Sequence, residues 1–408
     1  MKKKYFSQTH LCYSLLSSLP LLLALQIVFG SQPAFGSTLN RTPIILDDDG
    51  SQDGMNAWAY ILQNPKFEVK AMTISQGLAR PQIFGNNVMR MLAGLGITGI
   101  PVAVGRETPL SGNNTFPDAF RADTDIFWAP FTNLPDQTLE TVDQRSAAQL
   151  LVDTINQSPE PVEILMTGSA TNIADALTID PSIAKKISRL EIMGGAVFVP
   201  GNLREHLDPI LKQNLVSEFN IWIDPVAAQK VFSAGLPISL TPLDATNQIG
   251  FTRADQAAWK ATGTPESILA SQLLDYALTN ISGNDPLIPN PAWDLVAAIN
   301  LSEPSFCQPT PLHIEVNTDG KPEVNQGQTL AIPNQPPNTN VCLNPSLANL
   351  PFSSQELFSN KAKPHSVPEA NSGLGLLAAA ASAVLLRKRS NRQTAKKLRK
   401  GFHLGIIS

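Results

Sequence analysis

From Thr42 onward the chain alternates short apolar runs with longer stretches that have the apolar spacing of helices. Several runs are continuously apolar, as strands that are buried on both faces of a sheet are. This alternation is typical of βα units around a mainly parallel sheet. The runs that we interpret as strands are 44–46, 69–74, 102–104, 162–166, 190–193 and 238–241. The stretches with helical spacing are 55–62, 83–93, 147–156, 172–177 and 225–232.

The pattern predicts a single α/β domain over residues 37–344, with a mainly parallel Rossmann-like sheet flanked by helices and an active site at the carboxyl ends of its strands. Such a length is long for one core but possible for an α/β sheet. Two long segments, 106–143 and 197–217, interrupt the alternation, and long loops at strand ends commonly bind or cover ligands. We also expect a hairpin between 312–316 and 328–332.

The first predicted strand runs directly into a loop with four carboxylates in seven positions, Asp47, Asp48, Asp49 and Asp53. A helix is predicted next, so the acids lie at the carboxyl end of a strand, where open α/β sheets build their sites. Carboxylates this close repel one another unless a cation lies among them, and calcium prefers oxygen ligands of this kind. An ordinary acidic turn is the alternative, because turns favour Asp and Gly for local reasons.

Both ends of the chain look like targeting sequence. Residues 1–36 combine three lysines, an apolar run and a small-x-small cleavage motif, so we expect a signal peptide. Residues 345–366 have the composition of a linker. Residues 367–408 resemble a PEP-CTERM sorting signal, although Ala370 replaces its second proline and a basic tail follows; an ordinary C-terminal anchor is the alternative. We therefore expect an exported protein, periplasmic or at the cell surface, that is attached to the membrane.

Removing these ends changes the charge of the chain. The sequence has 30 Lys and Arg against 34 Asp and Glu, and 11 of the basic residues lie in the first four positions or after Leu386. The remaining chain is acidic by about 15 charges, since 19 basic residues face 34 acidic ones. Binding to nucleic acid phosphates is therefore not expected.

Cysteines are few. Cys12 lies in the expected signal peptide, which leaves Cys307 and Cys342 in the domain. An oxidising periplasm would allow these two to form a disulfide, and two unpaired buried thiols are the alternative. A cysteine metal site is excluded by so small a number.

Several segments together resemble the inosine-uridine nucleoside hydrolase family, in particular its purine-specific, inosine-adenosine-guanosine-preferring branch. The acidic loop matches the family's Asp-x-Asp-x-x-x-Asp-Asp opening. The other matches are 166–174 with Thr-Gly-x-x-Thr-Asn-Ile-Ala, 193–196 with Met-Gly-Gly, 201–202 and 218–225 with the ribose-binding stretch, and 292–294 with the Ala-Trp-Asp of the purine branch. The resemblance covers roughly residues 43–303. It implies hydrolysis of the N-glycosidic bond of (purine) ribonucleosides to ribose and free base.

The resemblance also implies a Ca²⁺ cofactor and roles for the matched residues. Calcium would chelate the ribose hydroxyls and hold a water beneath the anomeric carbon, with Asp49 as both ligand and general base. Further metal ligands would be Asp53, the carbonyl of Thr167 and Asp294. The residues expected to bind the substrate are Asp53, Asn202, Glu218, Asn220 and Met193. The partner would be a small nucleoside, with the membrane contacted by the C-terminal segment and a homo-oligomer left open.

These residues also have ordinary structural interpretations. Asp49 could be a satisfied turn aspartate, and Asp294 could be a helix N-cap. The substrate-binding set could be polar residues of a surface loop, and Met193 could belong to the core. The sequence alone leaves both interpretations open.

Departure of the base needs protonation or stacking. His206 and His313 are the domain's histidines, and neither is at a matched position, so a histidine general acid is not expected. In the purine branch the base is instead sandwiched between aromatic rings, which makes its ring nitrogen easier to protonate. The resemblance assigns these catalytic positions to Trp293 and Phe120. A core or lid aromatic is the alternative for each.

Two positions depart from the family pattern. Gly54 stands where the family has its second adjacent aspartate, so we expect weaker calcium binding unless Asp53 or Asp48 replaces that carboxylate. Leu78 stands where a polar residue usually faces the ribose. These losses leave open a non-catalytic nucleoside- or sugar-binding surface protein on the same fold. A haloacid-dehalogenase-type phosphatase would explain residues 47–51, but we find neither its later lysine nor its Gly-Asp-x-x-x-Asp loop.

Overall fold

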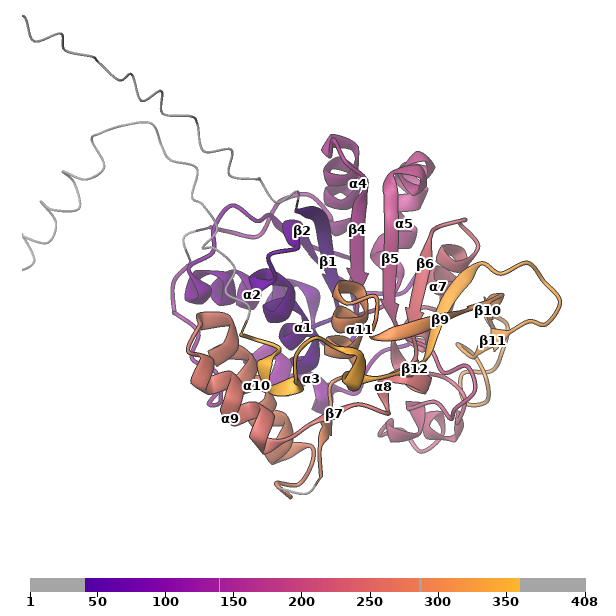
Figure 1. Ribbon diagram of the computed structural model, residues 1–408. Coiled ribbons are helices and arrows are strands. Elements are labelled where there is room, and N and C mark those ends of the chain that lie inside the picture. The colour runs from indigo at the N-terminus through magenta and orange to yellow at the C-terminus, as the bar shows by residue number, and fades with distance from the viewer. Residues whose placement is uncertain (1–40, 139, 286–287, 360–408) are drawn as a thin grey trace, which may run out of the picture. The chain divides into compact units, whose positions relative to one another are not determined.

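The computed structural model describes residues 41–138, 140–285 and 288–359, so the expected signal peptide and C-terminal anchor lie outside the described residues. An eight-stranded sheet in the order β3-β2-β1-β4-β5-β6-β12-β9 forms its centre (Figure 1). The parallel strands that the sequence predicted are β1 (Thr42–Asp48), β2 (Phe67–Ile74), β3 (Val102–Val104), β4 (Val162–Met166), β5 (Ile187–Met193) and β6 (Ile238–Thr241). The predicted fold class, an α/β domain with a mainly parallel sheet, is confirmed.

Two further strands extend this sheet. β12 (Thr339–Pro345) pairs with β6 in parallel, and β9 (Cys307–Leu312) pairs with β12 antiparallel. We did not predict either strand, because the segment is rich in Pro and Asn, which strands usually exclude. β9 lies at the edge of the sheet, where proline is tolerated.

Smaller strands lie outside the main sheet. The predicted hairpin is confirmed, with β10 (Ile314–Val316) antiparallel to β11 (Thr329–Ala331). β7 (Gly250–Phe251) and β8 (Asn290–Pro291) form another antiparallel pair.

A disulfide joins Cys307 of β9 to Cys342 of β12, with a Cα–Cα distance of 5.8 Å. Both cysteines are buried in the core, so the alternative of two unpaired thiols does not hold. The bond links positions 35 residues apart, and closing a loop of that size contributes on the order of 3–4 kcal/mol by restricting the unfolded chain.

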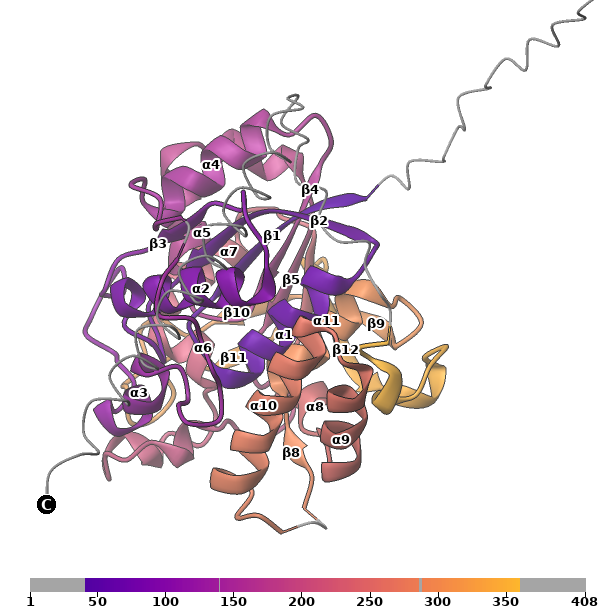
Figure 2. The same ribbon diagram turned by 90° about the vertical axis from the view of Figure 1, so that its left-hand side faces the viewer.

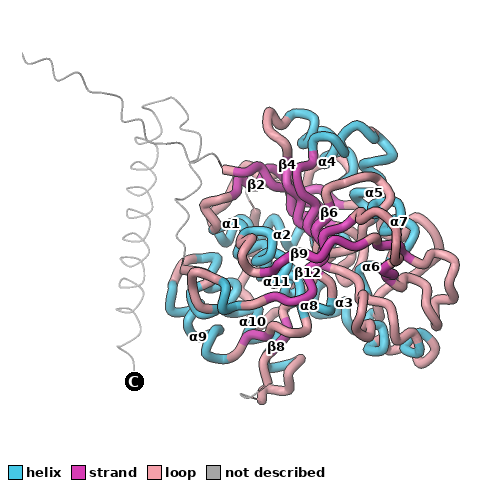
Figure 3. Tube along the Cα trace, turned by 45° about the vertical axis from the view of Figure 1, so that its right-hand side comes forward, coloured by secondary structure: helices cyan, strands magenta, loops and turns pink. Residues whose placement is uncertain are grey.

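Helices cover both faces of the sheet (Figure 3). One layer contains α1 (Gln52–Gln63), α2 (Pro81–Leu95) and α11 (Trp293–Ser302), and the other contains α4 (Ala147–Gln157), α5 (Thr171–Ile179) and α7 (Pro225–Phe232). Alternate residues of β1 point to opposite faces of the sheet. Ile44 and Leu46 pack against the layer of α1, α2 and α11, and Ile45 packs against the layer of α4, α5 and α7. This two-sided burial explains why the run before the acidic loop is apolar throughout.

Two helices that the sequence analysis did not predict, α9 (Arg253–Thr262) and α10 (Pro265–Asn280), add a second shell outside α1 (Figure 2). α10 contacts both α1 and α9. Shorter helices elsewhere in the domain are α3 (Asp118–Asp125), α6 (Phe219–Ile223) and α8 (Leu243–Thr246). None of the helices in the described ranges is both long and apolar enough to cross a membrane.

Residues 346–359 fold onto the domain, although we expected a linker to begin at residue 345. The Trp259 indole donates a hydrogen bond to the Ser354 carbonyl at 2.9 Å. Phe358 is fully buried, and its ring packs against the rings of Tyr60 and Trp259. The aromatic partners lie on α1 and α9, far away in sequence, so composition alone could not reveal this packing.

Candidate active site

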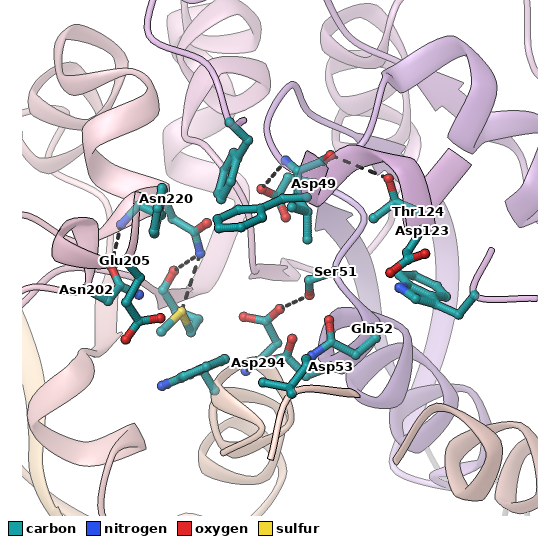
Figure 4. Close-up of a pocket in the computed structure, with 18 of the residues that line it drawn as sticks. Asp49, Ser51, Gln52, Asp53, Asp123, Thr124, Asn202, Glu205, Asn220 and Asp294 are labelled. Atoms are coloured by element: carbon teal, nitrogen blue, oxygen red, sulfur yellow. Dashed lines mark hydrogen bonds between the residues drawn. The ribbon is translucent and has the colours of Figure 1, made fainter. Parts of the chain in front are cut away.

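A pocket at the carboxyl ends of the parallel strands collects nearly all the residues singled out in the sequence (Figure 4). Those that line it are Asp49, Asp53, Phe120, Met193, Asn202, Glu218, Asn220, Trp293 and Asp294. Thr167 does not line it and is fully buried. Residues from the first and the last third of the described chain therefore meet in one cavity.

Asp49 is held between two loops that approach it too closely for side chains. A β-carbon added at Gly77 would lie 2.1 Å from Asp49 Oδ2, and one added at Gly168 would lie 2.7 Å from the Asp49 β-carbon. The Leu78 amide donates a hydrogen bond to Asp49 Oδ2 at 2.9 Å. Leu78 thus supplies a backbone donor at the position where we noted a missing polar side chain. Burial raises the pKa of the Asp49 carboxyl to about 7, and the Leu78 hydrogen bond opposes that rise.

Ser51 connects the start of α1 to the start of α11. Its hydroxyl oxygen accepts from the Gly54 amide at 2.7 Å, capping α1, and the same hydroxyl donates to Asp294 Oδ2 at 2.6 Å. The Asp294 amide donates to Asp53 Oδ2 at 3.1 Å. Burial, followed by the charge of Asp53, raises the pKa of Asp294 well above its ordinary value. Asp294 does not cap α11, because that helix has no side-chain cap bond.

Glu218 and its neighbours form the opposite wall of the pocket. The Glu218 carboxylate caps α6, accepting from the amides of Asn220 and Ile221, and also accepts from the Gly195 amide at 2.9 Å. These bonds and its burial exclude a surface-loop role, and burial raises its pKa. Asn202 Oδ1 accepts from the Phe219 amide at 3.0 Å, which leaves the Asn202 amide nitrogen free to face the pocket.

Asn220 connects this wall by hydrogen bonds to the carboxyl ends of β4 and β5. Its amide nitrogen donates to the carbonyl of Thr167 at 3.3 Å and to the carbonyl of Met193 at 3.2 Å. The Thr167 carbonyl therefore contacts Asn220, and Thr167 is not among the residues that line the cavity. Met193 is buried yet lines the pocket, so it belongs to both the core and the site.

The remaining acids of the loop point into the protein. Asp47 Oδ1 accepts from Thr73 Oγ1 at 2.5 Å and from Asn172 Nδ2 at 2.7 Å, while its Oδ2 is buried without a hydrogen-bond partner. Burial raises the pKa of Asp47 to about 7. Asp48 is also wholly buried, and burial followed by the charge of Asp49 raises its pKa well above the ordinary value. The loop thus concentrates negative charge where water cannot screen it.

No Lys or Arg of the described ranges forms an ion pair with these loop carboxylates or with Asp294. Equally, within the part of the chain that the structure describes, no three His, Cys, Asp or Glu side chains converge as a ready-made metal site. A cation held here would therefore need backbone, substrate or water oxygens to complete its shell.

Asp48 explains the glycine at position 54. A β-carbon added at Gly54 would lie 2.0 Å from Asp48 Oδ2, so the carboxylate of Asp48 occupies the space of a side chain at 54. That carboxylate accepts from Thr167 Oγ1 and from the Gly50 amide, both at 2.6 Å. It does not line the pocket. Of the two expected substitutes for the missing aspartate, Asp53 is the one that reaches the cavity.

Aromatic side chains close the pocket. Trp293 begins α11 and donates from its indole to Asn247 Oδ1 at 3.0 Å, whereas Phe120 lies on α3. Sequence reasoning missed Phe219, whose ring stacks on Phe116 at a centroid distance of 4.5 Å. Further lining residues that it missed are Ser51, Gln52, Asp123, Thr124, Trp128, Glu205, Tyr276 and Ile281. Most lie outside any motif, and the aromatic-rich segment 106–143 was the available signal for several of them.

We predict that Gly54→Ala lowers the free energy of unfolding by about 1–3 kcal/mol, because the new methyl group must displace the Asp48 carboxylate from its two donors. The measurement is chemical denaturation. Gly94→Ala in α2 is the control, since the nearest atom to its added β-carbon is 3.3 Å away.

The double variant Asp48→Ala, Gly54→Ala tests the cause. If the two side chains compete for one space, its loss of stability is smaller than the sum of the two single losses. Strictly additive losses would contradict the competition.

The sequence is similar to known ribonucleoside hydrolases. Residues 44–349 match the model of the family described as inosine-uridine preferring nucleoside hydrolase. The chain is 35% identical over 236 residues to the pyrimidine-specific ribonucleoside hydrolase RihA of Citrobacter koseri, covering 58% of this chain and 71% of that protein. Its identity to the RihA of Escherichia coli O1:K1 is 36% over the same length and shares.

Solved structures share the fold at lower identity. A purine-preferring ribonucleoside hydrolase from Gardnerella vaginalis superposes with a TM-score of 0.67 at 22% identity, covering 79% of this chain and 99% of that one. An inosine-uridine preferring nucleoside hydrolase from Bacillus anthracis superposes with a TM-score of 0.66 at 23% identity, with the same coverage. The family match spans most of the chain, and its members hydrolyse N-glycosyl bonds. The chain therefore belongs to the inosine-uridine preferring nucleoside hydrolase family and is a ribonucleoside hydrolase.

Proposed function

We propose that the enzyme cleaves purine ribonucleosides to ribose and free base, with Asp49 as the general base. The observation that carries the proposal is the position of Asp49, on the cavity surface between a polar wall and an aromatic one. Its raised pKa of about 7 suits a group that must accept a proton near neutral pH.

Calcium belongs to the proposal because the donors suit it. Asp49, Asp53 and Asp294 are buried carboxylates whose pKa values burial raises, and the charge of Asp53 raises the pKa of both Asp49 and Asp294 further. A hard cation would relieve that repulsion. The carbonyl of Thr167 is a further oxygen, although Asn220 already donates to it. When bound, calcium would polarise a water and align the ribose hydroxyls. Because protein donors are few, we expect calcium to bind more tightly when ribose is present.

The protein's own groups then account for cleavage. Asn202 can donate to the sugar through its free amide nitrogen, while Glu218 holds the wall rigid through α6. Asp49 removes a proton from the attacking water as the water oxygen bonds to the anomeric carbon. The carbon–nitrogen bond breaks, its electron pair leaves with the base, and the base takes up a proton. Fixed polar groups stabilise the oxocarbenium-like transition state without reorganising.

Aromatic rings support the purine preference. Trp293 and Phe120 both line the cavity and come from different elements, as two faces of a stacking site would. The names of the similar proteins differ in base preference, since RihA is called pyrimidine-specific and the Gardnerella vaginalis enzyme purine-preferring. The proposed purine preference therefore rests on the two rings.

We predict that the full chain with calcium releases reducing sugar from inosine and guanosine, and that Asp49→Ala lowers kcat by about 10² to 10⁴-fold, as loss of a general base does. The exposed Asp136→Ala is the matched control and should retain activity. Calorimetry should show weaker calcium binding by Asp49→Ala than by wild type. Full activity of Asp49→Ala would rule out its role as base.

A separate prediction concerns Trp293. Trp293→Ala should lower kcat for inosine by about 10-fold, the size of a lost stacking contact, while ribose affinity changes little. Trp293→Phe keeps a ring and should retain most activity. The same assays with uridine measure base preference: an inosine to uridine ratio of kcat/KM below 1, or turnover unchanged in Trp293→Ala, would overturn the purine assignment.

Export and membrane attachment are also proposed, on the sequence of the two ends. The disulfide supports an oxidising compartment. We predict that the protein sediments with membranes in cell fractions and that deletion of residues 367–408 releases it into the soluble exported fraction. Recovery of the intact chain from the cytosol would contradict this.

A further inference from the structure

Asp123 and Tyr276 form a hydrogen-bonded pair that no motif marks. The Tyr276 hydroxyl, on α10, donates to Asp123 Oδ2, on α3, and both residues line the pocket. The Asp123 carbonyl accepts from the Trp128 amide at 2.8 Å, which fixes its backbone. The Tyr276 ring packs edge-on against Phe131 at a centroid distance of 5.5 Å. Two elements remote in sequence thus hold one carboxylate at the cavity wall.

The pair lies at the end of the pocket away from the proposed sugar groups. Figure 4 shows Asp123 on one side, Asn202 and Asn220 on the other, and Asp49 between them. A nucleoside whose anomeric carbon lies near Asp49, and whose sugar faces Asn202, therefore directs its base toward Asp123. The Trp128 ring, which also lines the pocket, lies beside Tyr276 at a centroid distance of 6.5 Å, so an aromatic surface adjoins the pair.

Hydrogen-bond chemistry restricts what can bind there. Burial, and then the bond to Asp123, raise the pKa of Tyr276, so its hydroxyl remains a donor committed to Asp123 at neutral pH. Asp123 Oδ1 has no hydrogen-bond partner among the described residues. An ionised carboxylate can only accept. The complementary group on a ligand is a hydrogen-bond donor, and on the edge of a nucleobase that donor is an N–H group.

We propose that Asp123, positioned by Tyr276, accepts a hydrogen bond from an N–H group on the edge of the leaving base and so selects bases that carry one. The inference rests on the proposed function, because the orientation of the base follows from Asp49 being the general base. Hypoxanthine and guanine present a ring N–H, and adenine presents an exocyclic amine. A base without a donor leaves the carboxylate unpaired, which sites of this kind penalise.

The test compares the hydrolysis of inosine with that of purine riboside. Purine riboside has the same ribose and ring system as inosine but no N–H on its six-membered ring. We expect wild type to favour inosine in kcat/KM by about 10-fold or more, a modest value since Asp123 is partly exposed. Asp123→Asn should lower kcat/KM for inosine by a similar factor and leave purine riboside within about twofold. Asp118→Asn, on the same helix but exposed and paired with Arg80, is the control.

The variant Tyr276→Phe distinguishes the positioning of Asp123 by Tyr276 from the contact of Asp123 with the base. It keeps the ring and removes the hydroxyl, so it should raise KM for inosine more than it lowers kcat, with a smaller loss than Asp123→Asn. Equal losses on both substrates in Asp123→Asn would overturn the proposal and leave the pair as a structural tie between α3 and α10.

Binding gives a second readout that does not need turnover. In the Asp49→Asn background, inosine and purine riboside are titrated by calorimetry, with and without Asp123→Asn. A preference for inosine that Asp123→Asn removes supports the proposal even if hydrolysis of purine nucleosides fails. If only pyrimidine nucleosides bind, uridine and 3-methyluridine replace the pair, and equal affinity for both overturns the N–H contact.

Discussion

Uncompensated negative charge at the end of β1 is the constraint on which the site depends. Asp47, Asp48 and Asp49 are buried at consecutive positions, and the described basic residues form no ion pair with them. Burying an unpaired carboxylate is costly, so the fold surrounds this loop with donors. Those donors come from the ends of β2 and β4 and from the start of α5, which ties the position of the loop to the register of the parallel sheet.

The acidic loop also requires neighbouring backbone segments to pass very close to its carboxylates. Gly77 and Gly168 leave room for Asp49, and Gly54 leaves room for Asp48. The glycine that looked like a lost ligand in the sequence is thus part of a packing arrangement in which Asp48 fills the space. The sequence alone could not show that the Asp48 side chain fills the space at position 54, because positions 48 and 54 are not neighbours in any regular sequence pattern.

The sequence was informative where periodicity or motif carried the signal. The strand pattern and the matched motifs predicted six of the eight strands of the main sheet and nine of the pocket residues. The sequence did not predict features that depend on contacts between residues far apart in the chain. β9 and β12 depend on each other and on a disulfide, and Phe358 is buried by Tyr60 and Trp259. Asp123 and Tyr276 are 153 positions apart, and only tertiary packing joins them.

The edges of the main sheet limit how copies of this chain could associate. β3 has three residues, and β9 carries Pro309 and Pro311, which have no N–H to offer a neighbouring strand. Both edges therefore discourage continuation of the sheet from one molecule into the next. We therefore expect contacts between copies of this chain to use elements other than these two edge strands.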